Sequence, residues 1–486
     1  MDGIGPERLR ECLEILAEVE RLPPEHPDAV AVRRAVGGIF KTVKQERRAE
    51  RRARVTAHDA AVTAATATAA PGRIDDETEG VPLATATTTE LAGILERARG
   101  CYVCKRRYVE VDAFYHQLCP ECAAFNRAKR NARCDLTDRT ALLTGGRAKI
   151  GMYIALRLLR DGAHTTITTR FPTDAVRRFT AMPDSADWLH RLRVVGLDLR
   201  DPAQVIALAD SVAAAGPLDI LINNAAQTVR RSPGAYSHLV AAESAPLPDG
   251  PLPEVLVLSG AVRAHPRELA ELATHALPGG GPVSVPGPVS GELLTALALT
   301  SGSASLERVA AGTAIDAGGL VPDLAVDNSW TARVHEVAPL EMLEVQLCNM
   351  TAPFLLVSRL RPALAASPAR RSYVVNVSAM EGQFTRGNKG PGHPHTNMAK
   401  AALNMLTRTS AQEMFASDGI LMTAVDTGWI TDERPHPTKA RLHEEGFRAP
   451  LDLVDGAARV YDPVVRGEAG EDLFGVFLKD YQPYPW

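Results

Sequence analysis

Apolar and polar positions divide the chain into regions with different periodicities. Residues 6–22 and roughly 28–58 repeat apolar positions at helical spacing, which predicts two N-terminal helices. From Arg139 onward, short apolar runs alternate with segments whose apolar residues recur every three or four positions. Alternating strands and helices are typical of a doubly wound parallel sheet with helices on both faces. The pattern therefore predicts an α/β domain over residues 136–486.

Turn-rich stretches separate and interrupt these regions. A Thr/Ala-rich stretch and an acidic segment with Gly and Pro follow the second helix, so we predict a helical segment over residues 1–74 and a linker over 75–98. Residues from 236 to about 322 include SAPLPDGPLPEVL and ALPGGGPVSVPGPVSG. Such a stretch is too long for a connection inside a compact domain, and we interpret it as an inserted subdomain or lid.

Four of the seven cysteines form two CxxC pairs separated by fourteen residues. Each pair points two thiolates at one centre, and two pairs supply the closed tetrahedral four-sulfur shell that Zn²⁺ prefers. The spacing predicts a small zinc ribbon over residues 99–135, whose metal is structural because no coordination position stays open. A redox dithiol is the alternative interpretation. The predicted metal ligands are Cys101, Cys104, Cys119 and Cys122.

Charge and hydropathy narrow the class of protein. A formal net charge of −4 over 486 residues gives no general case for a nucleic-acid or membrane partner. The basic run at residues 44–54 alternates Arg with Glu, which is typical of a solvated helix face. The N-terminus lacks a basic start followed by an apolar core, and no apolar run approaches the roughly 20 residues of a membrane span. We expect a cytoplasmic protein.

An ordered series of motifs points to a nucleotide-binding site. From Arg139 the chain reads RTALLTGGRAKIGMYIALRLLRDGA, and LDLR, LDILINNAA, CNMTAPFLL, YVVNVSAMEG and NMAKAALNML follow. This series resembles the short-chain dehydrogenase/reductase family over residues 139–235 and 323 to about 480. The resemblance implies a Rossmann domain whose glycine-rich turn lets the backbone approach a dinucleotide pyrophosphate. Lys149 departs from the family pattern TGxxxGxG, since it replaces the middle glycine.

The residues after the second predicted strand indicate the cofactor. An acidic side chain there would repel a 2′-phosphate, whereas Arg170, together with Arg147 in the glycine turn, offers guanidinium groups suited to phosphate. We therefore predict NADP(H) rather than NAD(H). The remaining cofactor contacts implied by the resemblance come from Thr144, Gly145, Gly146, Lys149, Ile150, Gly151, Thr169, Asp198, Leu199, Asn224, Ala225, Ala226, Lys400 and Gly428.

The resemblance also implies a catalytic set of Asn, Ser, Tyr and Lys, and here that set is incomplete. Asn349 and Lys400 match the family positions, but Thr396 stands in place of the Tyr and Ala379 in place of the Ser. Ser378 is one residue earlier and would point to the opposite face of a strand. A threonine hydroxyl is too short to replace the phenol, so the usual proton donor and the polarising hydroxyl are both missing.

Other side chains could supply the proton. His393 and His395 lie just before Thr396, in a segment expected to face the nicotinamide, and imidazole titrates near pH 6.5. Asp426 replaces the proline of the family's PG segment. The candidate catalytic residues are therefore Lys400, Asn349, Thr396, His393, His395 and Asp426.

Three functions stay open at this point. The first is an NADP(H)-dependent oxidoreductase with a rewired proton donor, acting on a small polar carbonyl, imine or enone. The second is a catalytically silent NADP(H)-binding scaffold or sensor that binds a protein partner through the zinc ribbon or the N-terminal helices. The third is a nonredox enzyme that reuses the cofactor cleft. The resemblance further implies a possible homodimer built by helices over residues 340–364 and 396–417.

Overall fold

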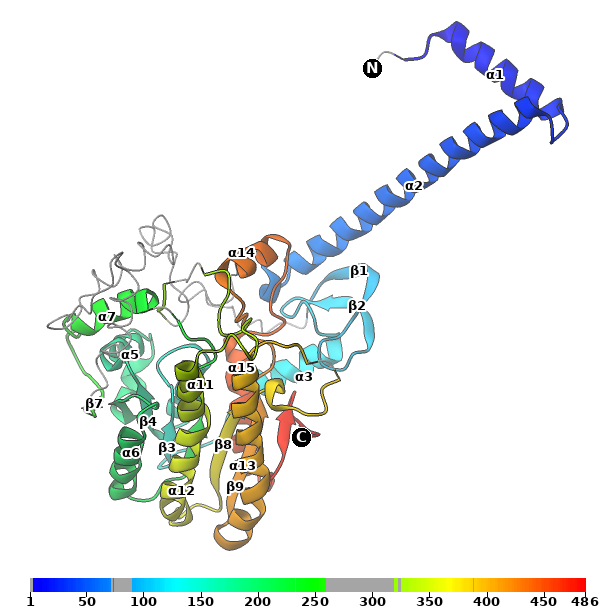
Figure 1. The fold of residues 1–486 in the computed structure, drawn as a ribbon. Helices are drawn as coiled ribbons and strands as arrows, with labels where there is room; N and C mark the ends of the chain where they lie inside the picture. Colours follow the sequence, from blue (N-terminus) through cyan, green and yellow to red (C-terminus); the bar gives the residue numbers. More distant parts are fainter. Residues whose placement is uncertain are drawn as a thin grey trace, which may run out of the picture.

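A nine-stranded sheet forms the centre of the molecule (Figure 1). The computed structural model describes residues 3–70, 73, 90–231, 233–258, 319–321, 325–387 and 389–486. The strand order is β11-β10-β9-β8-β6-β3-β4-β5-β7, and every pair is parallel except the β10–β11 hairpin. The strands are β3 (Thr140–Leu143), β4 (His164–Thr169), β5 (Leu192–Gly196), β6 (Ile220–Asn223), β7 (Glu254–Val257), β8 (Ser372–Ser378), β9 (Ile420–Asp426), β10 (Phe477–Lys479) and β11 (Gln482–Tyr484).

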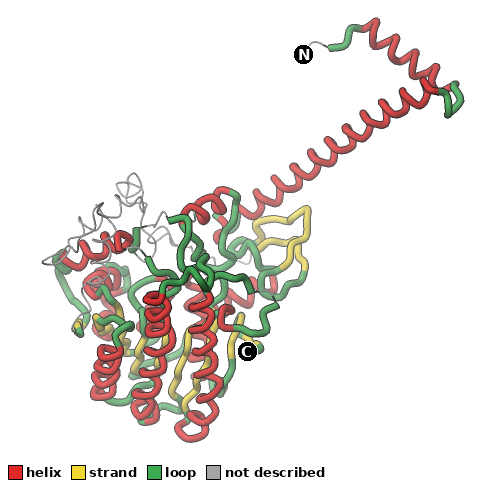
Figure 2. The backbone as a smooth tube through the Cα atoms, in the orientation of Figure 1, coloured by secondary structure: helices red, strands yellow, loops and turns green. Residues whose placement is uncertain are grey.

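Helices cover both faces of this sheet, as Figures 1 and 2 show. Along β3, Leu142 packs into the apolar core of one face, while Ala141 and Leu143 pack into the core of the other. Successive strand side chains point to opposite faces, so a strand buried on both sides is a continuous apolar run. The predicted doubly wound α/β fold is confirmed. One face carries α4 (Lys149–Arg160), α5 (Pro172–Thr180) and α15 (Leu453–Glu468), and the other carries α6 (Pro202–Ala215), α12 (Ala352–Ala365) and α13 (Pro394–Asp418).

A π-helical turn interrupts the helix that ends in α12. Helix α11 (Pro339–Gln346) runs into the π turn η5 (Leu347–Thr351) and then into α12. In the described part of the chain this 27-residue stretch is the one helix long and apolar enough to cross a membrane. Leu356 and Leu360 are buried against the sheet, as in a core helix of a soluble protein.

The two predicted N-terminal helices form an arm that projects from the body (Figure 1). They are α1 (Pro6–Arg21) and α2 (Pro27–Ala64), and their buried side chains are Val19 and Ala29. The basic run at residues 44–54 is exposed along its whole length. The C-terminal part of α2 contacts the segment that follows it in the described chain: His58 Nε2 lies 2.9 Å from the carbonyl oxygen of Ile94.

The four-cysteine module consists of β1 (Leu91–Gly100), β2 (Arg107–Asp112) and α3 (Pro120–Asn131). The predicted linker over 75–98 was wrong in its second half, because β1 begins at Leu91. Register shifts along β1 and a mostly exposed surface remove the alternating pattern by which a strand is recognised. Residues 74–89 lie outside the described residues.

The predicted insertion begins later than expected. Helix α7 (Ser237–Ser244) packs near α5, and β7 pairs in parallel with β5 at the edge of the main sheet. The apolar run at residues 255–258 therefore belongs largely to the main domain. Residues 259–318, which make up most of the predicted insertion, lie outside the described residues.

Candidate active site and four-cysteine site

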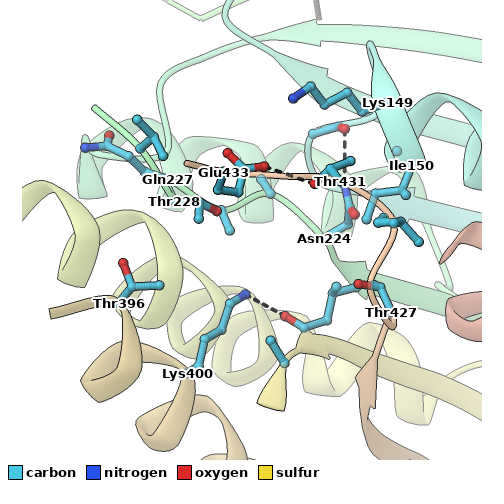
Figure 3. Close-up of a pocket in the computed structure, with 18 of the residues that line it drawn as sticks. Lys149, Ile150, Asn224, Gln227, Thr228, Thr396, Lys400, Thr427, Thr431 and Glu433 are labelled. Carbon is cyan, nitrogen blue, oxygen red and sulfur yellow. Dashed lines mark hydrogen bonds between the residues drawn. The ribbon is translucent and has the colours of Figure 1, made fainter. Parts of the chain in front are cut away.

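A cavity of about 1260 Å³ lies at the carboxyl ends of the parallel strands. Loops that follow several different strands converge at this edge, which is where open α/β sheets bind ligands. All of the predicted cofactor residues line the cavity except Thr144 and Gly146. Of the predicted catalytic residues, Lys400, Thr396 and Asp426 line it, whereas Asn349, His393 and His395 do not. Figure 3 shows Lys149 and Lys400 on opposite sides of the space.

The glycine turn after β3 is fixed by close backbone approaches. Gly145 has φ +70°, and a Cβ atom at Gly151 would lie 2.0 Å from the Gly145 carbonyl oxygen. At Gly146 a Cβ would lie 2.5 Å from Ile167, so this glycine lets the turn pack on β4. Asn224 Nδ2 donates to the carbonyl oxygen of Gly145 at 3.2 Å (Figure 3) and to that of Thr144 at 3.0 Å. The turn therefore needs these residues for its shape.

Lys149 takes the left-handed conformation that the replaced family glycine would adopt easily. Its φ is 52°, which costs a non-glycine residue about 1–2 kcal/mol. The residue keeps the backbone path of the turn and adds a positive side chain to the cavity wall.

Guanidinium groups gather where β4 ends. Arg170 Nη2 lies 3.2 Å from the Tyr236 hydroxyl, and its guanidinium stacks over the Tyr236 ring at 5.0 Å. Arg147 and Arg178 both bind Asp174, at 2.5 and 2.6 Å. One carboxylate thus serves two arginines, and Arg147 and Arg170 both line the cavity. This end of the cavity suits a phosphate group.

Asp198, one of the predicted cofactor residues, is paired with Arg200, which was not among them. Arg200 Nη2 lies 2.7 Å from Asp198, and Arg200 Nη1 lies 3.0 Å from Glu344. Burial by itself would raise the pKa of Asp198, but Arg200 holds that pKa below its usual value. Arg200 belongs to the same LDLR motif and lies two residues after Asp198, so this spacing could have indicated the pair.

Lys400 and Thr396 face the cavity from α13. Lys400 Nζ donates to the carbonyl oxygen of Val377 at 2.8 Å, and burial lowers the pKa of Lys400 to about 8. The Thr396 hydroxyl is buried and has no hydrogen-bond partner in the described part of the chain. Ser378 Oγ instead donates to Asn404 at 2.5 Å, so it does not take the place left by Ala379. The family's two hydroxyl groups have no direct substitute here.

Asn349 supports the loop after β6 and does not line the cavity. It lies in the π turn η5, where its Oδ1 accepts from the Gln227 backbone N–H at 2.7 Å and its Nδ2 donates to the Gln227 carbonyl at 3.0 Å. The side chain is 1% exposed. The structure gives Asn349 a positioning contact where the resemblance implied a catalytic one.

The two histidines also lie apart from the cavity, in contrast to the expectation. The His393 ring stacks on Trp330 with ring centres 3.9 Å apart, and its Nδ1 lies 2.8 Å from the Trp330 carbonyl oxygen. Helix α13 already begins at Pro394, which turns His395 toward α11, with Nε2 3.4 Å from Glu341. The contact of His393 with Trp330 joins segments 63 residues apart, and no local pattern in the sequence indicates it.

Asp426, the acidic residue among the predicted catalytic residues, lines the cavity. It ends β9 and is 6% exposed, and its carboxyl group makes no ion pair or hydrogen bond with the described residues. Burial, with the charge of Asp480 nearby, raises the pKa of Asp426 to about 6. A carboxyl group with this pKa holds and releases protons close to neutral pH.

Several further cavity residues come from segments that are distant in the sequence. They belong to the four-cysteine module, to the segment after residue 325 and to the C-terminal hairpin, and no local pattern marks them. They include Tyr102, Val103, Lys105, Trp330, Lys479 and Tyr484.

The four predicted cysteine ligands come together as a cluster. Their Sγ atoms all lie within 4.8 Å of one another, and the Sγ atoms of Cys104 and Cys119 are 3.7 Å apart. A tetrahedral ion with metal–sulfur bonds of about 2.3 Å places its sulfurs roughly 3.8 Å apart, so the residues fit a metal ion. The Cys119 backbone N–H also donates to Cys101 Sγ at 3.3 Å, which favours a thiolate.

The chain is similar to several known proteins. A protein-family model described as short chain dehydrogenase matches residues 139–240. Uncharacterized protein R665 of Acanthamoeba polyphaga mimivirus is 31% identical over 377 residues, which are 75% of this chain and 71% of that protein. A peroxisomal 2,4-dienoyl-CoA reductase of Danio rerio is 35% identical over 95 residues, 19% of this chain and 30% of the reductase. The structure of an NADPH-bound carbonyl reductase from chicken fatty liver aligns at 17% identity and a TM-score of 0.42, covering 72% of this chain and 100% of that one.

The raised pKa of Asp426 predicts a pH-dependent gain in stability for Asp426→Asn. The folded protein prefers the protonated carboxyl, so this group's stabilisation is complete below the unfolded pKa near 3.8 and is lost as pH rises through about 6. At pH 8 we expect Asp426→Asn to exceed the native free energy of unfolding by up to about 3 kcal/mol, at about 1.4 kcal/mol per pKa unit. Near pH 4 the two proteins should agree. Urea denaturation at both pH values measures this difference.

Asp472→Asn is the control of opposite sign. Asp472 pairs with Arg370 and Arg371, which hold its pKa down at about 2, so its removal should lower stability at pH 8. If the free energy of unfolding depends on pH in the same way for Asp426→Asn and the native protein, the pKa of Asp426 is not raised in the folded state.

Proposed function

The chain belongs to the short-chain dehydrogenase/reductase family, and from this we propose that it is an NADP(H)-dependent oxidoreductase. The observation that carries the proposal is that one cavity joins the glycine turn, Arg170 and Lys400. These groups would meet the pyrophosphate, the 2′-phosphate and the nicotinamide ribose of one extended cofactor. This chain matches only 30% of the length of the Danio rerio reductase. The reaction and the substrate are therefore part of the proposal.

The cofactor residues fit NADP(H). The N-terminus of α4 presents backbone N–H groups and its positive dipole end toward the glycine turn, where a pyrophosphate would bind. Arg170 and Arg147 would bind the 2′-phosphate, and Lys400 would hold the ribose. When bound, NADPH supplies a hydride. The chain's own residues then have to orient the substrate and supply a proton.

We propose a conjugated alkene as the substrate class. Thr396 and Ala379 leave the site without the phenol and hydroxyl that protonate and polarise a carbonyl oxygen. An alkene conjugated to a carbonyl accepts the hydride at its far carbon while the electron pair moves toward the carbonyl, and one proton then completes the reduction. The match to 2,4-dienoyl-CoA reductases, which act on such a bond by name, supports this class.

Asp426 is the proposed proton donor. It lines the cavity, its pKa of about 6 leaves it partly protonated near neutral pH, and no hydrogen bond within the described residues competes for its proton. The two histidines would have been the alternative donors, but both lie outside the cavity lining. Because neither histidine lines the cavity, a second candidate function is a catalytically silent NADP(H)-binding scaffold or sensor.

For the cysteine cluster we propose a structural zinc ion, one per chain. Four thiolates close the coordination shell, so the ion would stabilise the module and leave no position for substrate. Four reduced thiolates also agree with a cytoplasmic location, which stays a proposal.

A homodimer through the outer surface of α12 and α13 is proposed as the assembly. Large apolar side chains are exposed on this surface, including Phe354 at 52%, Met398 at 55% and Met405 at 54%. A second copy packed on this surface would remove these apolar side chains from water, which favours association. The two helices contact each other on one side of the sheet (Figure 1).

Replacing Arg170 should separate the two cofactors. We expect Arg170→Ala to weaken NADPH binding about 10- to 100-fold, because a charge-assisted hydrogen bond to phosphate is lost, and to leave NADH binding unchanged. Fluorescence titration of both cofactors measures this. Arg408→Ala, at an exposed position of α13, is the control and should bind NADPH like the native protein. Equal loss for NADPH and NADH would contradict a 2′-phosphate site.

Replacing Asp426 should remove the proton donor. With a 2,4-dienoyl-CoA, a simple enone and a simple ketone as probes, we expect NADPH oxidation only with the two conjugated alkenes. The native rate should fall as pH rises through about 6, where Asp426 loses its proton. Asp426→Asn should lower the rate roughly 10²- to 10⁴-fold and abolish this pH dependence. NADPH binding without turnover of any probe would favour the scaffold.

The dimer proposal predicts that Phe354→Glu is monomeric. A charge in the centre of an apolar interface would have to be buried without a partner, which strongly disfavours association. Light scattering after size exclusion should give twice the chain mass for the native protein and the chain mass for the variant. Leu13→Glu, on the exposed arm helix α1, should stay dimeric. The reverse pattern would place the interface on the N-terminal arm.

A further inference from the structure

The loop that carries two of the metal-binding cysteines is also part of the cavity wall. Tyr102 and Val103 lie between Cys101 and Cys104, and together with Lys105 they line the cavity. A residue held between two ligands of one ion has little freedom to move while the ion is bound. The wall at this end of the cavity therefore depends on the four-cysteine site.

Tyr102 holds the turn that follows β9. The Trp429 backbone N–H donates to the Tyr102 hydroxyl at 2.9 Å. Gly428, one residue earlier, has φ +77°, and a Cβ atom there would lie 2.7 Å from Leu451. The turn is thus pressed between Leu451 and the metal-binding loop. Asp426, the proposed proton donor, stands only two residues before Gly428.

Apolar packing connects the same loop to the cofactor end. The four-cysteine module and the sheet domain share one apolar core, in which Cys101 and Cys119 are buried beside Ile430 and Leu451. Ile150, in the first turn of α4 next to Gly151, packs against this core. The module consequently touches both ends of the cavity: the turn at residues 428–429 through Tyr102, and the glycine turn through Ile150.

The loop of residues 101–104 is restrained by the rest of the four-cysteine module. Backbone contacts tie it to the second cysteine pair, since Tyr102 N donates to the Gln117 carbonyl at 2.8 Å and Cys119 N donates to Cys101 Sγ at 3.3 Å. Small modules of this kind commonly lose their structure without the metal. Removal of the ion would release the Tyr102 side chain from the turn.

We propose that occupancy of the four-cysteine site sets the shape of the substrate end of the cavity, and that Tyr102 is the positioning residue that transmits it to the turn at residues 428–429. This goes beyond the proposed function, because it concerns the coupling of a metal site to a cavity and holds whether or not hydride transfer occurs. A ligand in the cavity and an ion on the cysteines would then favour each other.

Hydrogen exchange of the full-length, zinc-loaded protein tests the proposal. In Tyr102→Phe the Trp429 amide loses its acceptor while the ring and the cysteines stay, so a peptide covering residues 427–434 should exchange roughly 2- to 10-fold faster. The zinc content should remain one ion per chain. Tyr484→Phe is the matched control, a cavity tyrosine whose hydroxyl makes no hydrogen bond in the described residues, and it should exchange like the native protein.

Removal of zinc with a chelator should have a wider effect. Peptides covering residues 427–434 and 144–152 should both exchange faster, while one covering β5 should be unchanged. Unchanged exchange at residues 427–434 after zinc loss would overturn the proposal, as would native-like exchange in Tyr102→Phe. If chelation also speeds exchange in the β5 peptide, the module's loss has unfolded more of the protein. The exchange of zinc-loaded Tyr102→Phe at residues 427–434 then tests the proposal by itself.

Enzyme kinetics distinguish a Tyr102 that shapes the substrate end of the cavity from one that only stabilises the fold. This measurement rests on the proposed function. With the 2,4-dienoyl-CoA probe, Tyr102→Phe should raise KM about 3- to 10-fold with kcat within twofold, since its hydroxyl shapes the wall and takes no part in proton transfer. Unchanged KM would contradict the role of Tyr102. If the native protein binds no NADPH, the proposed function fails, and the exchange experiment still tests the coupling.

Discussion

A buried ion pair joins the four-cysteine module to the sheet domain, and the arrangement of the cavity depends on it. Arg130 on α3 binds both carboxylate oxygens of Asp452 at 2.6 and 2.8 Å and reaches Asp455 at 3.0 Å, all of them buried. The Tyr115 hydroxyl also donates to Asp455 at 2.7 Å. Loss of one member would leave a buried charge unpaired, at a cost of about 3–5 kcal/mol. The pair therefore fixes α3, and with it the four-cysteine module, at the start of α15.

Burial governs the acid–base chemistry that the cavity can perform. The same physical cause acts in opposite directions on two of the titratable groups that line it, raising the pKa of Asp426 to about 6 and lowering that of Lys400 to about 8. Both groups thus change protonation near neutral pH without the Tyr and Ser that Thr396 and Ala379 replace. A carboxyl pKa raised by burial and a lysine pKa lowered by burial both approach the pH at which proton transfer is most efficient.

The cofactor half of the site could be predicted because its signals are local. A glycine turn between a strand and a helix fixes both its own conformation and its position at the sheet edge, so Gly145, Gly151 and Asn224 lie where the motif placed them. The catalytic half could not be predicted in the same way. His393 and Asp426 were both plausible from the sequence, but Trp330 covers the histidine and β9 delivers the aspartate to the cavity.

By itself the sequence determined the doubly wound sheet, the two N-terminal helices and the cysteine cluster, because periodicity and ligand spacing act over a few neighbouring residues. Only the tertiary structure decided that the cysteine module is a wall of the cavity and that the strand over residues 91–100 belongs to it. Tyr102 and Trp429 are 327 positions apart, and their hydrogen bond exists because two segments pack into one apolar core. Contacts of that kind depend on the packing of the whole chain, which no short pattern records.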